Sequence, residues 1–190
     1  IQGMVVAAPM NGNELRHLLY TGLDYNKGPF AIRYPKASSE KFDDHGQAEL
    51  LPIGSWEVVR SGSDVVILAV GSQVYDALDC ADQLIKEDML CEVVNCRFIK
   101  PMDIAYLESI VNRFQQVITV EEGVRSGGFG EGVVAWLSNN GYKGQTKIIS
   151  LPDEFVEHGP RKDLLDKCGI NPEGIKHSIL NTKLRLDIKV

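Results

Sequence analysis

Two adjacent glutamates open a glycine-rich stretch in the second half of the chain. The segment EEGVRSGGFGEG, from Glu121 to Gly132, has five glycines within ten residues. Carboxylates can act as general acids or bases, and backbone N–H groups at a helix start can hold a phosphate. The spacing, however, matches neither G-x-G-x-x-G nor G-x-x-x-x-G-K-[ST]. We therefore interpret Gly127, Gly128 and Gly130 as residues that let a strand and a helix pack closely.

The two glutamates do not form an acid/base pair by themselves. On a strand Glu121 and Glu122 would point to opposite faces, so a second catalytic acid would have to come from elsewhere. We favour a structural or interface role, in which a carboxylate accepts hydrogen bonds from the glycine loop, and keep catalysis as the alternative. Glu131, at the helix start, would compete with any bound anion.

A second candidate site is the segment IRYPK, at the end of an expected strand. Arg33 and Lys36 place two cations within four residues, and Pro35 stiffens the backbone between them. A guanidinium can hold a phosphate with two hydrogen bonds, and an ammonium adds a point charge. The segment is thus a possible phosphate grip. Arg97 and Lys100 repeat the pattern, and we interpret them as a solvated or interface pair.

Composition narrows the classes of partner. The formal net charge is -6 with a pI of about 5.2, and acids and bases are interleaved, which argues against nucleic acid or an anionic membrane as a partner. No apolar run reaches the length of a membrane span and no signal peptide is visible, so we expect a cytoplasmic protein. Without a C-x-x-C pair we predict no metal site and interpret the cysteines as buried small hydrophobes: Cys80, Cys91, Cys96 and Cys168.

The elements that must position these residues alternate between strand and helix. This order predicts an α/β fold, a mostly parallel sheet with helices on both faces, preceded by a small β-α-β unit. A polar segment, residues 36–51, reads as a solvated linker that includes His45 and the pair Asp43–Asp44. The expected strands are 4–8, 30–34, 56–59, 64–70, 91–96, a run that ends at Val120, and 147–151. The expected helices are 14–25, 74–87, one after Asp103, 132–139, 160–168 and 172–180.

Several motifs, taken together, resemble one enzyme family. GPFAIRYPK, LPIGSWEVVRSG, DVVILAVGSQV, VVNCRFIKPMD, ITVEEGVRSGGFG and LPDEFVEHGPRKDLLDKCGI occur in this order. They are similar to the C-terminal part of the 1-deoxy-D-xylulose-5-phosphate synthases, over nearly the whole chain. The resemblance implies a thiamine-diphosphate- and Mg²⁺-dependent transferase that condenses pyruvate with glyceraldehyde 3-phosphate and releases carbon dioxide. Its product would feed isoprenoid, thiamine and pyridoxal phosphate synthesis.

The resemblance also implies a domain plan. Residues 1–40 would be the remnant of a pyrimidine-binding domain, 41–52 a linker, and 53–190 a transketolase C-terminal domain. The chain starts inside a strand-like pattern without an initiator Met, which predicts a larger protein. The metal motif and the catalytic residues of the family have no counterpart in the chain. We therefore expect no catalytic residue, no bound cofactor and no activity in this chain alone, and a homodimer as the assembly.

One site residue carries over from the resembled family. The motif RYPRG contacts the substrate phosphate through its second arginine, and RYPKA here places Lys36 at that position and Ala37 where the family has glycine. A lysine keeps the positive charge but cannot form the bidentate contact of an arginine, so Arg33 could provide part of the phosphate binding.

Three alternatives stay open. VTVEEG-like and RFIKPMD-like motifs also occur, in looser form, in transketolases and in the β subunits of 2-oxo-acid dehydrogenases, so the chain could be the C-terminal domain of either. A stand-alone module that binds a small anion at the carboxyl edge of its sheet is the third alternative.

Overall fold

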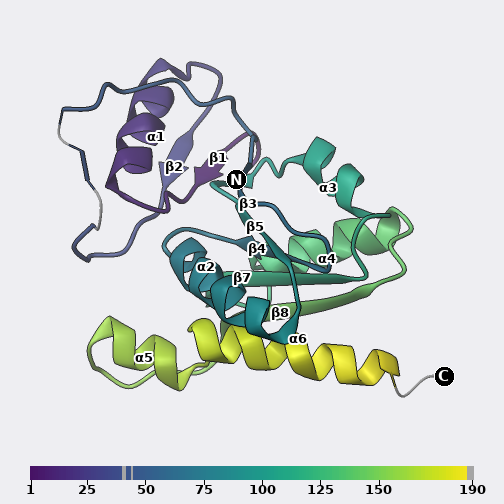
Figure 1. The fold of residues 1–190 in the computed structure, drawn as a ribbon. Coiled ribbons are helices and arrows are strands. Elements are labelled where there is room, and N and C mark those ends of the chain that lie inside the picture. Colours follow the sequence, from purple (N-terminus) through teal and green to yellow (C-terminus); the bar gives the residue numbers. More distant parts are fainter. Residues whose placement is uncertain (40–41, 44, 188–190) are drawn as a thin grey trace.

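The structure, a computed structural model, describes residues 1–39, 42–43 and 45–187, with two sheets flanked by helices (Figure 1). The smaller sheet has the strand order β2-β1-β6 and the larger one the order β3-β5-β4-β7-β8. The strands are β1 (Val5–Ala7), β2 (Phe30–Ile32), β3 (Glu57–Arg60), β4 (Val65–Ala69), β5 (Cys91–Asn95), β6 (Phe98–Lys100), β7 (Gln116–Val124) and β8 (Gln145–Leu151). The helices are α1 (Gly12–Asp24), α2 (Gln73–Leu84), the 3-10 turn η1 (Ile85–Glu87), α3 (Ile104–Ile110), α4 (Phe129–Asn139), α5 (Arg161–Lys167) and α6 (Pro172–Asp187).

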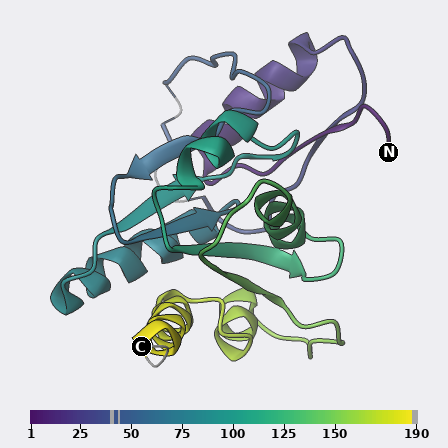
Figure 2. The same cartoon turned by 90° about the vertical axis from the view of Figure 1, so that its right-hand side faces the viewer.

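The larger sheet has the predicted architecture. β5, β4, β7 and β8 pair in parallel, and only the edge strand β3 is antiparallel. Every residue of β4 and β5 is buried, as is usual where helices cover both faces of a parallel sheet. α2 and α6 cover one face, and α3 and α4 the other (Figure 2). The α/β prediction is confirmed.

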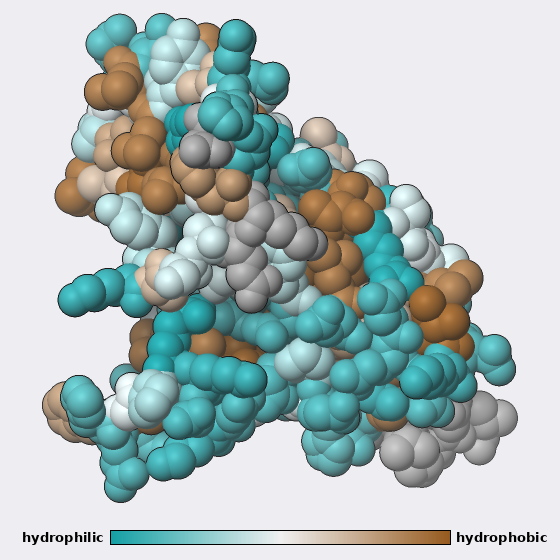
Figure 3. Space-filling view, turned by 60° about the vertical axis from the view of Figure 1, so that its left-hand side comes forward, coloured by the Kyte–Doolittle hydropathy of each residue, from teal (hydrophilic) through white to brown (hydrophobic). Residues whose placement is uncertain are grey.

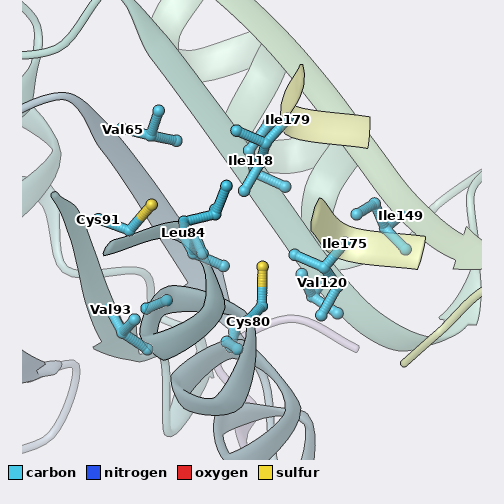
Figure 4. Packing of buried hydrophobic residues seen from close by; sticks show 14 of the residues in the cluster. Val65, Cys80, Leu84, Cys91, Val93, Ile118, Val120, Ile149, Ile175 and Ile179 are labelled. Carbon is cyan, nitrogen blue, oxygen red and sulfur yellow. The ribbon is translucent and has the colours of Figure 1, made fainter. Parts of the chain in front are cut away.

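Strand alternation divides the interior into two cores. Val65 and Ile67 of β4 face α2 and α6, whereas Val66 and Leu68 face α3 and α4. Figure 4 shows the first core, where α6 presents apolar side chains to the sheet. At the end of α2, Leu84 is fully buried in this core, whereas Ile85, the next residue, is 47% exposed.

The N-terminal unit forms the predicted β-α-β arrangement, with β1 and β2 parallel. It differs from the prediction in one respect, because β6 adds to β1 as an antiparallel strand. No separate sequence signal marks β6, because only Cys96 and Arg97 separate it from β5 and its residues read as the tail of the same run. Through β6 the larger domain supplies the third strand of the smaller sheet. The indole N–H of Trp56 donates to the carbonyl of Phe98 and fastens this strand to the larger domain.

Two boundaries in the glycine-rich region were predicted wrongly. β7 does not end at Val120 but continues to Val124, because β8 offers a pairing partner as far as Leu151 beyond a local register shift. α4 begins at Phe129 rather than at Gly132, and its first turn finds a hydrogen-bond acceptor in the strand itself.

The polar segment after β2 is exposed but is tied to α1. The carbonyl of Asp43 accepts from Arg16, and the N–H of Glu49 donates to His17 Nδ1. The N–H of Leu51 donates to the hydroxyl of Thr21. The segment therefore follows α1 rather than crossing solvent freely. Asp44, half of the acidic pair in the predicted linker, lies outside the described residues.

Candidate functional site

The carboxyl ends of both sheets meet at one cleft. The residues that follow β1, β2 and β4, together with part of β7, line a pocket of about 200 Å³. A second pocket of about 270 Å³ adjoins it and shares four residues with it: Pro9, Tyr34, Pro35 and Ser72. Figure 3 shows the surface hollowed between the lobe that contains the N-terminal unit and the lobe below it. Ligands of open α/β sheets bind outside the carboxyl ends of strands, so this cleft is the candidate site.

The two cations of IRYPK occupy different places at the cleft. Arg33 lines the smaller pocket, and its side chain is 46% exposed. Its Nη2 lies 3.9 Å from Glu121 Oε2, a loose ion pair that offsets part of its charge. Lys36 is exposed and lines neither pocket, although Ala37 behind it lines the larger one. That both side chains bind one phosphate therefore remains a prediction.

Glu121 lies beneath the glycine-rich loop and is fully buried. Its carboxylate accepts the N–H groups of Phe129, at 3.0 Å, and Gly130, at 2.8 Å, which begin α4. Such side-chain oxygens satisfy N–H groups that a helix start leaves without partners. The carboxylate therefore occupies the position in which a phosphate would have to bind.

The loop has glycine at positions where a larger residue would collide with neighbouring atoms. A Cβ on Gly128 would lie 2.4 Å from the carbonyl oxygen of Val124, and one on Gly130 would lie 2.4 Å from the hydroxyl of Thr119. Gly127 has a φ of +71° and donates its N–H to Glu131 at 2.7 Å. The loop is a close-packed connection between β7 and α4, and the N–H groups of Gly127, Phe129 and Gly130 donate to carboxylates.

Glu122 faces the opposite way and lines the smaller pocket. Its two oxygens accept from Arg161, at the start of α5, and the same guanidinium donates to the hydroxyl of Ser72 at 2.8 Å. Arg161 and Glu122 are each 34% exposed. This cluster joins α5, β7 and the start of α2 at the floor of the cleft.

Asp76 adds a titratable group to the larger pocket. Its burial, with Asp79 nearby, raises its pKa to about 6, and Arg161 opposes the shift. The neighbouring hydroxyl of Tyr75 accepts from the side-chain amide of Asn11 at 3.0 Å, which links α2 to the N-terminal unit across the pocket. The pocket thus combines hydroxyl, carboxyl and guanidinium groups whose charges nearly cancel.

Comparison with known proteins shows the family to which this chain belongs. The model of the "Transketolase, C-terminal domain" family matches residues 54–175. The chain belongs to the transketolase C-terminal domain family. It is also 42% identical, over 179 residues, to 1-deoxy-D-xylulose-5-phosphate synthase of Aquifex aeolicus, and 41% identical, over 180 residues, to that of Gloeobacter violaceus. Each match covers 94% of this chain and 28% of the relative, so the chain spans under a third of the relatives' length.

A solved structure agrees with the fold. A protein described as a split-gene transketolase, an inactive β4 tetramer, superimposes with a TM-score of 0.81 at 26% identity. The match covers 94% of this chain and 57% of that one. The resemblance seen in the motifs, to the C-terminal part of the synthases, is confirmed at the level of the family.

A buried polar network joins the transketolase C-terminal domain to the N-terminal unit. Glu14 of α1 is 7% exposed and accepts from the amide of Asn95, at 2.7 Å, and from the N–H of Met10, at 2.6 Å. Arg97 lies 3.6 Å from Glu14 and 3.1 Å from Glu57. Burial raises the pKa of Glu14, and Arg97 and the hydrogen bonds oppose this effect. Of the two roles expected for Arg97, solvated or interface, its burial beside Glu14 excludes the solvated one.

Sequence patterns did not point to several cleft residues of the transketolase C-terminal domain. Ser72, Asp76 and Arg161 come from elements far apart in the chain, and their residue types are common on solvated helix ends. The one available signal is that Ser72 follows Gly71 directly after a buried strand, where α/β sheets place ligands. Within the described part of the chain, no group of three potential metal ligands comes together and no helix is long and apolar enough to cross a membrane.

Proposed function

We propose that this chain is the C-terminal part of a 1-deoxy-D-xylulose-5-phosphate synthase, a cytoplasmic enzyme. The observation that supports this function best is the 42% identity to such a synthase, which extends over 94% of the chain. The transketolase neighbour has a lower identity of 26%. The complete enzyme would condense pyruvate with glyceraldehyde 3-phosphate and release carbon dioxide, for isoprenoid, thiamine and pyridoxal phosphate biosynthesis.

The cofactor of that enzyme would be held by parts other than this chain. Thiamine diphosphate, when bound with Mg²⁺, supplies the electron sink that decarboxylation of pyruvate requires. Mg²⁺ in such sites takes carboxylate ligands besides the phosphate oxygens. The described residues offer no cluster that fits this requirement. We therefore assign no catalytic residue to this chain and expect the 190 residues alone to be inactive.

The domain plan in this proposal follows the two sheets. Residues 1–40 are the C-terminal remnant of the pyrimidine-binding domain, 41–52 the connection and 53–190 the transketolase C-terminal domain. The start of the family match at residue 54 supports the second boundary. β6 (residues 98–100) belongs to the C-terminal domain in the sequence but pairs with β1 in the smaller sheet. This strand would therefore fix the two domains relative to each other.

The role of this chain in catalysis would be to present cations to the acceptor substrate. Arg33 lines the cleft and Lys36 stands exposed beside it, so both can approach a phosphate that enters from solvent. Glu121 lies 3.9 Å from Arg33 and weakens its positive field, which leaves Lys36 as the stronger candidate. An exposed lysine contributes a point charge without fixed geometry.

The test uses the encoded full-length protein with thiamine diphosphate, Mg²⁺ and both substrates. We expect the full-length enzyme to form deoxyxylulose phosphate and the 190-residue chain to form none. Lys36→Ala should raise KM for glyceraldehyde 3-phosphate roughly tenfold, the equivalent of one charge contact of about 1.4 kcal/mol, without changing KM for pyruvate. Lys36→Arg should retain the wild-type KM, and Lys27→Ala, at an exposed lysine that lines neither pocket of the cleft, is the matched control.

One result would contradict this function, and another would contradict only the role of Lys36. If the full-length protein transfers a two-carbon unit from a ketose phosphate and does not use pyruvate, the chain comes from a transketolase. If Lys36→Ala leaves both KM values unchanged, the phosphate contact lies elsewhere and the synthase activity itself stands.

We further propose that the protein associates with itself. Its partners would be a second copy of the chain and small-molecule substrates, with no nucleic acid and no membrane. The solved neighbour, described as a β4 tetramer, is in line with such an assembly. Glu121 and the loop glycines are engaged within the chain, so we assign them an indirect role, in which they order the region rather than contact the other copy.

A further inference from the structure

The strand β8 is the less protected edge of the larger sheet. It is seven residues long, pairs with β7 on one side, and has no other strand as a partner among the described residues. The opposite edge, β3, has four residues, a register shift, and charged side chains at both ends that pair with Arg97 and Asp82. Such features block further pairing, whereas β8 contains one charged residue, Lys147. An edge of this length is a template for another strand.

The charges beside β8 differ between its two ends. Lys143 precedes the strand and is exposed, whereas Asp153 and Glu154 follow it and are also exposed. If two copies of β8 pair in antiparallel fashion about a two-fold axis near Ile148, the basic end of each copy lies against the acidic end of the other. Lys143 then faces Asp153 of the other copy, twice in one interface. Parallel pairing would instead place like charges together.

An exposed aromatic residue lies in the same region. Phe155, in the loop after β8, is 106% exposed, more than any other large apolar residue of the described chain, and Val156 beside it is 39% exposed. Aromatic residues are enriched in the cores of protein interfaces. The antiparallel arrangement brings this loop to the turn around Tyr142 of the other copy, a half-buried aromatic residue.

We propose that β8 and the loop of residues 152–157 form a two-fold interface with a second copy of this chain. This inference rests on the self-association proposed above and adds the surface on which it occurs. The two five-stranded sheets join into one continuous sheet through β8. Backbone hydrogen bonds join the two β8 strands, and the Lys143–Asp153 contacts favour the antiparallel direction. Phe155 packs near the turn around Tyr142 of the other copy at each end of the interface.

A disulfide tests the register directly. Lys143→Cys and Asp153→Cys are combined in the encoded protein with Cys168→Ser, since Cys168 is half-buried and the other three cysteines are buried. In one copy the two positions lie at opposite ends of β8, roughly 25–30 Å apart by the rise of a strand, too far for an internal disulfide. We expect mild oxidation to give a covalent dimer on a non-reducing gel. Either single cysteine variant in the same background should stay monomeric on that gel.

Sedimentation velocity gives the second measurement. Phe155→Ser should raise the dimer dissociation constant tenfold or more, and Leu90→Ser, an equally apolar exposed residue on a distant turn, should leave it unchanged. Lys143→Glu and Asp153→Lys should each weaken the dimer, and the double variant should restore it.

The outcomes separate the two proposals. A dimer that forms without the cross-link and tolerates Phe155→Ser overturns this surface and leaves self-association in place. A protein that stays monomeric at every concentration overturns both the β8 surface and self-association. The catalytic assay of the full-length enzyme tests the synthase function separately from these two proposals.

Discussion

Glu121 and Glu122 are neighbours in the sequence and lie in different environments, because successive side chains of a strand point to opposite faces. Glu121 is fully buried and holds the start of α4, whereas Glu122 faces the cleft and holds α5 through Arg161. The pair thus connects two helices to the carboxyl end of one strand. This division of roles makes the two carboxylates unequal in their contribution to stability.

Glu121→Gln should destabilise the protein by about 2–3 kcal/mol. A glutamine offers one acceptor oxygen to the two buried N–H groups of Phe129 and Gly130, and its amide nitrogen would meet a second donor. The matched change Glu122→Gln should cost about 1 kcal/mol or less, since that ion pair is partly exposed. Urea unfolding of both variants measures the difference. An equal cost would show that the buried N–H groups find another acceptor.

Asp76→Asn should stabilise the protein at neutral pH. The folded-state pKa of about 6 lies above the ordinary value of 3.8, so the folded form binds the proton more tightly. Stability of the natural protein therefore falls as pH rises from about 4 to about 6. The variant lacks this loss and should be more stable by about 1–2 kcal/mol at pH 8, after allowance for solvent screening. At pH 4 the two proteins should unfold alike.

Thermal unfolding at pH 4 and pH 8 measures this difference. The exposed Asp24→Asn is the control and should show no gain that grows with pH. A gain for Asp76→Asn that is equal at both pH values would mean that packing, rather than the charge, is responsible.

At the scale of elements, glycines decide how closely strands and helices approach. Gly62, before β4, lies against the backbone of β5, and a Cβ there would be 2.2 Å from the carbonyl carbon of Cys91 and from the nitrogen of Glu92. Gly132, inside α4, has open space, with its nearest neighbour, Met102 Sδ, at 3.8 Å. Both residues read as loop or helix glycines in the sequence, and only the packing separates them.

Gly62→Ala should therefore cost about 3 kcal/mol or more, because backbone atoms cannot move aside as a side chain can. Gly132→Ala should raise stability by about 0.5–1 kcal/mol through the better helix propensity of alanine. Chemical unfolding of the two variants provides the comparison. A destabilised Gly132→Ala would show that α4 needs the glycine for a contact outside the chain.

At the scale of the whole molecule, the N-terminal unit depends on the larger domain. β6 completes its sheet, and Glu14 lies in a buried network with Asn95 and Arg97 at the junction. The unit has a small core of its own, with four buried apolar residues: Val5, Ala7, Leu18 and Phe98. One of the four, Phe98, comes from the larger domain. The unit and the domain should therefore separate when this junction is weakened.

Glu14→Ala should loosen the N-terminal unit more than the larger domain. The change leaves the buried amide of Asn95 and the partly buried N–H of Met10 without this acceptor and removes a partner of Arg97, at a cost of about 2–4 kcal/mol. Hydrogen exchange should become faster in residues 5–32, with little change in β4 and α2. Glu49→Ala, an exposed carboxylate beside α1, is the control. Uniform acceleration across the chain would show that the two parts unfold together.

The sequence by itself determined the alternation of elements and the family. Short continuous apolar runs rich in β-branched residues, such as DVVILAV, are typical of strands covered on both faces, and α2 buries one face, so both elements follow from local patterns. The structural reading of the glycine loop also came from spacing alone, because the motif lacked the positions that phosphate binding needs.

Tertiary structure alone decided which distant residues meet. β6 pairs with β1 across more than ninety positions of sequence, and Arg161 reaches Glu122 only because α5 folds back under the sheet. In the sequence Arg97 could be a solvated or an interface cation, and its burial beside Glu14 depends on how the two sheets are joined. The pattern of apolar and polar residues in a sequence shows which face of a helix or strand is buried and which is exposed. The contacts between polar groups of different elements depend on the packing of the whole chain, so the cleft became visible only in the structure.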